Sequence, residues 1–156
     1  MQLGHDIVDR ARTIIAGIEH AGLCRSVDQV EMTEYMLACT ARFIYGAALD
    51  MHEQEIKERN QWTDLRQELI LIAMRRMGKS VAAALYSAAI FMAVIVIKIV
   101  IFSTGEQAAS AQMGLLGGII SILTKYAGVE SFTRKSERHV VLGEREVHAM
   151  TGSEDR

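Results

Sequence analysis

The stretch from Val81 to Phe102, VAAALYSAAIFMAVIVIKIVIF, places the strongest constraint on the fold of this chain. Its 22 residues include one charge, Lys98, and neither proline nor glycine. As a helix rising about 1.5 Å per residue it would reach about 33 Å, enough to cross a hydrocarbon core of roughly 30 Å. The alternative is a central helix of a soluble bundle, but such helices are usually shorter and amphipathic. The stretch therefore predicts a membrane-spanning helix.

A second apolar stretch follows a short polar turn and extends from Ala108 to about Ala127. Within it Ser110, Gly114 and Gly118 recur every four positions, the small-xxx-small pattern of closely packed membrane helices. Glycine is also common in membrane helices generally, so the pattern alone does not require a contact. We expect a second span whose three small residues mediate helix–helix contact.

Basic residues flank the two predicted spans, whereas the turn between them holds only Glu106. Positive charge accumulates on the cytoplasmic side of membrane helices, which predicts that both termini are cytoplasmic. The residues that set this orientation are Arg75, Arg76, Lys79, Lys125, Arg134 and Lys135. We therefore expect an integral protein of a bacterial inner membrane.

The residues before the first span predict a cytoplasmic domain of about three helices. Residues 5–21 carry apolar side chains at helical spacing, and Ser26-Val-Asp-Gln29 has the form of a capping box that opens a helix reaching about residue 58. A third helix is expected to continue from about residue 63 to residue 102 as one rod. One face of the second helix is predicted to pack against the first helix or in a coiled coil through Leu37, Ala41, Ile44, Ala48 and Met51.

Together these features predict an all-α membrane protein. Its parts are a cytoplasmic helical domain (1–79), a two-span hairpin (80–128, with spans of about 81–102 and 108–127) and a polar cytoplasmic tail (129–156). The chain has no proline, which is compatible with long uninterrupted helices. In the tail, His139-Val-Val-Leu142 predicts one short element.

Short motifs do not indicate catalysis. Gly78-Lys79-Ser80 matches the end of a phosphate-binding loop, but the strand that this motif needs before it is not predicted. The spacings of four other residues match no compact zinc site: His20, Cys24, Cys39 and His52. We expect no enzyme, cofactor or metal. The net charge of −2 also argues against nucleic acid as a partner.

Lys98 is the residue that best separates the remaining functions. A charge inside a span normally faces protein or water, although near the end of a span it can reach the headgroups instead. We expect a small homo-oligomeric pore-forming effector or channel, with Lys98 as a cationic ring near the outer mouth. The layout resembles two-span holins and the two-span effectors of bacterial defence systems.

The alternative is a non-conducting, membrane-anchored scaffold or adaptor subunit of an envelope or secretion complex. Its cytoplasmic helices would bind another protein. The expected partners are membrane lipid, further copies of the chain and, for the adaptor, a cytoplasmic protein.

Overall fold

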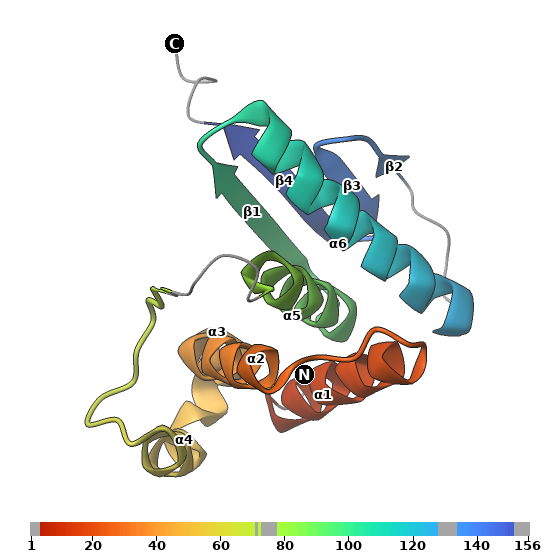
Figure 1. The fold of residues 1–156 in the computed structure, drawn as a ribbon. Helices are drawn as coiled ribbons and strands as arrows, with labels where there is room; N and C mark the ends of the chain where they lie inside the picture. Colours follow the sequence, from red (N-terminus) through yellow and green to blue (C-terminus); the bar gives the residue numbers. More distant parts are fainter. Residues whose placement is uncertain (1–3, 71, 73–77, 128–133, 152–156) are drawn as a thin grey trace.

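The chain combines helices in its first part with a four-stranded mixed sheet in its last part (Figure 1). The computed structural model describes residues 4–70, 72, 78–127 and 134–151. The helices are α1 (Gly4–His20), α2 (Val27–Cys39), α3 (Ala41–Tyr45), the 3-10 helix η1 (Gly46–Met51), α4 (Glu53–Asn60), α5 (Lys79–Ala93) and α6 (Glu106–Ala127). The strands are β1 (Ile97–Ser103), β2 (Arg134–Lys135), β3 (His139–Leu142) and β4 (Arg145–Thr151).

The expectation of an all-α protein with a two-span hairpin is wrong, because the predicted first span is a helix followed by a strand. α5 ends at Ala93, and the chain bends through Val94–Val96 into β1. Every residue from Val94 to Ile101 except Lys98 is β-branched, and such residues favour strands. The 15 residues of α5 extend about 22 Å at about 1.5 Å each, which is too short for a span.

Tertiary contacts reinforce the change from helix to strand. Arg145, at the start of β4, donates a hydrogen bond from Nε to the carbonyl oxygen of Val94 at 2.6 Å. Val94 is extended, with φ −95° and ψ 142°. The predicted rod from residue 63 to 102 is therefore wrong at both ends, because residues 63–70 and 72 are not helical and the helix that begins at Lys79 ends before β1. Residues 71 and 73–77 of the predicted rod lie outside the described residues.

α5 is the central helix of the fold. It packs against α1 and α2 on one side and against α6 and the start of β1 on the other (Figure 1). Leu85, Ala88 and Phe91 have no exposed surface. A helix that is apolar on every face can be enclosed by lipid or by protein. In this protein neighbouring helices enclose it.

The helix expected from residue 27 to about 58 is divided into α2, α3, η1 and α4. Its capping box forms as predicted: the Gln29 amide donates to Ser26 Oγ, and the Ser26 amide donates to Gln29 Oε1. The first break comes at Thr40, whose hydroxyl lies within hydrogen-bond distance of the carbonyl oxygens of Met36 and Leu37. Such bonding to the preceding turn bends helices.

The predicted packing face of that helix is divided by the same breaks. Leu37, Ala41 and Ile44 are buried in the core, whereas Ala48 is half-buried and Met51 is 77% exposed. The two groups separate at Gly46, which has a φ of +50°. The buried residues pack within the chain itself and offer no docking surface.

The sheet has the strand order β1-β4-β3-β2. β1 pairs in parallel with β4, and the other two pairs are antiparallel. A two-residue turn joins β3 to β4, and its first residue, Gly143, has the positive φ of +60° that a type II′ hairpin requires. The segment expected as a polar tail thus contributes three strands, and the short element predicted at residues 139–142 is β3.

One face of this sheet is covered by α6 (Figure 1). Val140, Val147 and Ala149 point to this covered face and are buried. Among the described residues, α6 is the one helix whose length and composition would allow it to cross a membrane. Membrane location therefore stays a prediction.

Candidate interaction surface on the sheet

Exposed and covered residues alternate along β1, as they do in a strand with one face on a core. Ile97, Ile99 and Ile101 face α6, and Lys98, Val100 and Phe102 lie on the opposite face. We call this opposite side of the sheet the outer face. Its members are Lys98, Val100 and Phe102 of β1, His139 and Val141 of β3, and Glu146, His148 and Met150 of β4.

The outer face carries a charged cluster on adjacent strands. Lys98 and Glu146 are register partners, and Lys98 Nζ lies 3.6 Å from Glu146 Oε2. His139 Nε2 lies 2.8 Å from Glu146 Oε1, and the His139 and His148 rings are 5.4 Å apart between centroids. The hydrogen bond from His139, together with the nearby charge of Lys98, lowers the pKa of Glu146 below its usual value.

The outer face also has an apolar part, which lies along β1. Phe102 is 75% exposed and Val100 is 39% exposed. Ile95 and Val96, in the bend just before β1, are exposed as well. Two apolar side chains of β1 and two in its approach are therefore exposed to water.

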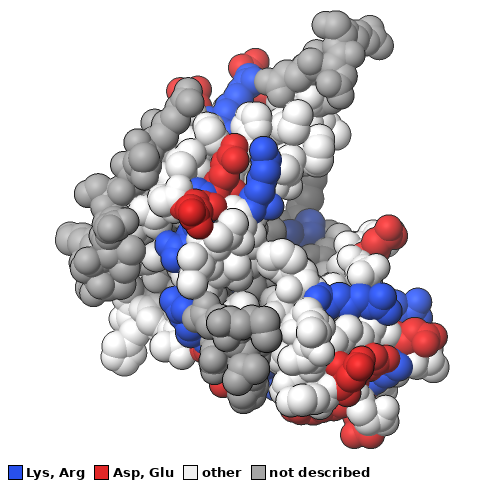
Figure 2. Space-filling model, turned by 180° about the vertical axis from the view of Figure 1, so that it is seen from behind, with Lys and Arg blue, Asp and Glu red and all other residues white. Residues whose placement is uncertain are grey.

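Charges of both signs are interspersed on the side of the molecule opposite to Figure 1 (Figure 2). Lys and Arg lie next to Asp and Glu there, with uncharged residues between them, in the part of the chain that the structure describes. Binding to a nucleic acid backbone typically uses a continuous basic surface. On the face that Figure 2 shows, the described residues form no such continuous basic surface.

β1 is a terminal strand of the sheet, with β4 on one side and no described strand on the other. An edge strand directs unpaired N–H and C=O groups outward, which makes it a template for another strand. Proteins usually protect such edges with proline, bulges, charged side chains (lysine above all), a very short strand, or a covering helix or loop. β1 has 7 residues, IKIVIFS, with one lysine and no proline.

The structure places the other predicted site residues apart from this surface. Gly114 and Gly118 are exposed on α6, Ser110 is half-buried, and a Cβ added at either glycine would lie in open space. Within the described part of the chain, this stripe has no packed partner at its glycines. Lys98, predicted as a pore charge, lies instead on the outer face.

The predicted orientation residues are spread over several segments. Lys79 is the first residue of α5, while Arg75 and Arg76 lie outside the described residues. Lys125 is in α6, and Arg134 and Lys135 form β2. For these three residues the structure describes the backbone alone.

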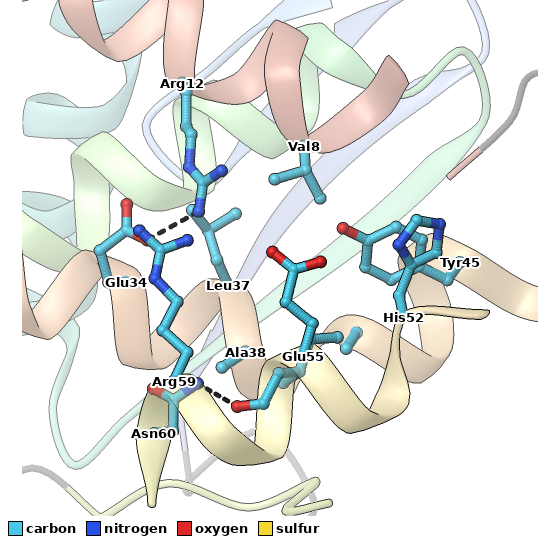
Figure 3. A pocket seen from close by; sticks show the side chains of 12 residues that line it. Val8, Arg12, Glu34, Leu37, Ala38, Tyr45, His52, Glu55, Arg59 and Asn60 are labelled. Carbon is cyan, nitrogen blue, oxygen red and sulfur yellow. Dashed lines mark hydrogen bonds and ion pairs between the residues drawn. The ribbon is translucent and has the colours of Figure 1, made fainter. Parts of the chain in front are cut away.

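A polar pocket of about 90 Å³ lies among α1, α2 and α4 (Figure 3). Arg12 Nη2 contacts Glu34 Oε2 at 2.9 Å, and Arg59 Nη2 approaches the same oxygen at 3.9 Å. His52 stacks on Tyr45 with ring centroids 4.3 Å apart. The hydrogen bond with Glu34 raises the pKa of Arg12.

This pocket is too small for most ligands. At about 30 Å³ per water it would hold about three waters, whereas small-molecule sites measure roughly 300–1,000 Å³. Its clearest charge contact is the pair of arginines on Glu34. We interpret the pocket as a solvated crevice. The contacts of Arg12 and Arg59 with Glu34 beside it hold α1, α2 and α4 together.

Metal-ligand residue types meet on the outer face as His139, Glu146 and His148, but not in an arrangement that could hold an ion. Within the ranges that the structure covers, no three His, Cys, Asp or Glu side chains are grouped so as to hold a metal ion. Cys39 is buried, with Sγ 3.9 Å from the carbonyl oxygen of Glu68, while Cys24 is exposed. Burial raises the pKa of the Cys39 thiol.

Sequence reasoning missed the outer face because it assigned β1 to a membrane helix and β4 to a tail. Two signals could have indicated the sheet. One is the β-branched run from Val94 to Ile101, and the other is the Gly143-Glu144 turn between two segments with alternating apolar residues.

No family model matches the chain, and no curated protein or solved structure matches it significantly. The outer face and the unpaired edge of β1 are therefore the observations from which a function is argued.

Proposed function

We propose that this protein is a non-catalytic binding module that adds an extended polypeptide segment to its sheet at the edge of β1. The observation that carries the proposal is a mainly apolar edge strand of 7 residues that has no described strand beside its outer edge and that exposes Val100 and Phe102. Strand addition obtains affinity from main-chain hydrogen bonds and specificity from alternate side chains.

The apolar side chains favour occupancy of this edge. Burying a large apolar side chain such as that of Phe102 contributes about 1.5–3 kcal/mol. Phe102 is 75% exposed without a partner, so most of that contribution is still available for binding. Lys98, held near Glu146, limits the partners to strands that tolerate a positive charge at one position.

This function is of the adaptor class, but it uses a different surface from the helical face predicted from the sequence. Leu37, Ala41 and Ile44 are buried within their own chain. The pore hypothesis relied on a two-span hairpin that the fold does not contain. Membrane attachment through α6 remains a separate prediction.

A display library of random ten-residue peptides tests the proposal. We expect enriched peptides to alternate apolar and polar residues, and to slow amide hydrogen exchange within β1. The Val100→Asp variant should lose this binding, because it places a charge where the added strand packs. Val141→Asp is the matched control on β3, two strands from the edge.

Two outcomes would contradict the proposal. One is that no peptide is enriched against the folded protein at a concentration where the protein is monomeric. The other is that the enriched peptides bind Val100→Asp as tightly as they bind the unmodified chain.

A further inference from the structure

We infer that the strand that pairs with β1 is β1 of a second copy of this chain, in antiparallel orientation about a two-fold axis at Val100. The inference rests on the proposed function, because it names the partner of the same edge. It follows from the lengths of the two edges of the sheet, from the register that β1 allows with itself, and from the placement of charge.

The two edges of the sheet are unequal. β1 offers 7 residues for pairing, whereas the described part of β2, at the opposite edge, has 2. A head-to-tail assembly would pair β1 with β2 of the next copy and would leave most of β1 unpaired. Pairing β1 with β1 uses the whole strand, and this isologous contact closes as a dimer.

When β1 pairs along its whole length with β1 of a second copy, the pairing is centred on one residue. Val100 is the midpoint of Ile97–Ser103, so it faces Val100 of the other copy. Ile99 then lies opposite Ile101, and Ile97 lies opposite Ser103. Because residues directly opposite each other in an antiparallel pair share a face, the two Val100 side chains meet on the outer face.

This register is also compatible with the charges. Lys98 of one copy lies opposite Phe102 of the other, where an ammonium group over an aromatic ring is attractive. The two lysines are four residues apart along the ladder, about 14 Å, which exceeds the screening length of about 8–10 Å. Each lysine also keeps Glu146 beside it, at 3.6 Å in the single chain.

The dimer would have one continuous sheet in the order β2-β3-β4-β1-β1-β4-β3-β2, with both copies of α6 on the same side. Its interface consists of one strand pair and a few side chains, which places it at the small end of protein interfaces. We therefore expect a reversible dimer with a Kd on the order of micromolar.

Sedimentation velocity from about 1 to about 300 µM, a range that brackets that Kd, tests the dimer. We expect the unmodified chain to dimerise, and Val100→Lys and Val100→Glu each to be monomeric because like charges meet at the axis. An equal mixture of the two variants should restore a dimer, because opposite charges then meet. Val141→Lys, a control on the same face, should leave the dimer unchanged.

Cysteine cross-linking tests the same register without introducing a charge at the interface. In a Cys24→Ser background, Val100→Cys should be joined to its counterpart by a short thiol-reactive cross-linker, while Val141→Cys should not. Buried Cys39 is common to both variants.

Three results would overturn the inference: a monomer across the whole concentration range, a dimer that survives Val100→Lys, or charge variants that stay monomeric when mixed. If the chain is monomeric but β1 still binds selected peptides, this inference fails and the proposed function stands. If β1 also binds no peptide, both fail.

Discussion

Lys98 on β1 and Glu146 on β4 are register partners in a parallel strand pair, with Nζ and Oε2 3.6 Å apart. The Lys98 side chain is 60% exposed. The only charge in the apolar run is thus a surface residue of a sheet. The lysine interrupts the β-branched residues at a position that faces water.

We predict that Lys98→Leu leaves the melting temperature nearly unchanged. An exposed ion pair contributes little to stability, because water and salt screen it. Thermal unfolding followed by circular dichroism measures the effect. A large loss of stability would mean that Lys98 is enclosed by protein.

The stability contributed by Glu146 should depend on pH. Its pKa in the folded chain is lowered, first by the hydrogen bond from His139 and also by Lys98. Because the folded pKa lies below the unfolded value, the contribution is present above that value and is lost as pH falls through the folded pKa. The stability difference between the unmodified chain and Glu146→Gln should therefore shrink below about pH 4.5, the ordinary value. Chemical denaturation at several pH values checks this, and a difference that grows on acidification would reverse the sign.

Glycine substitutions should change the free energy of unfolding differently on the covered side and on the open side of α6. Gly117 is buried, whereas Gly114 and Gly118 are exposed, with open space where an added Cβ would lie. We predict that Gly117→Leu costs about 1–3 kcal/mol through overpacking. Gly118→Leu should be neutral or stabilise by up to about 1 kcal/mol, because leucine favours helix. Urea unfolding of the purified variants decides the order, and the opposite order would mean that the stripe is an internal contact.

Charges on α6 test the remaining membrane prediction. Leu116 is fully buried and Gly118 is exposed. With α6 packed on the sheet in water, Leu116→Lys should cost more than about 3 kcal/mol and Gly118→Lys should be tolerated. Within a bilayer both lysines would oppose insertion. Membrane flotation of the three chains distinguishes these states: bilayer insertion requires that the unmodified chain float and that both variants float less.

Tyr86 connects α5 to the break between α2 and α3. Its hydroxyl donates a hydrogen bond to Thr40 Oγ1 at 2.8 Å, and burial raises its pKa to about 12. The raised pKa means that its contribution is present below pH 10 and is lost as pH rises from 10 towards 12. We predict that Tyr86→Phe costs about 1 kcal/mol near neutral pH and reduces alkaline unfolding. An unchanged alkaline midpoint in Tyr86→Phe would contradict the assignment.

Local features of the fold could be predicted from the sequence. The Ser26 capping box and the helix at residues 5–21 depend on neighbours in the chain, and both are present as a cap and as α1. Val8, Ala11 and Ile15, which share one face of α1, are buried. Both features depend on residues that are a few positions apart in the chain, so the spacing of residue types is enough to predict them.

Tertiary structure decided what surrounds the apolar run and where it changes conformation. The amino-acid pattern of α5 suits a lipid environment and a protein interior equally, and the packing of α1, α2 and α6 selects the second. β1 forms because β4, 48 residues later in register, supplies its hydrogen-bond partners, as with Lys98 and Glu146. A parallel pairing of this kind depends on closing a long loop, so a local pattern can indicate the strand β1 but not its partner β4. The candidate site lies on that pairing, which is why the sequence alone indicated Lys98 but not the surface that surrounds it.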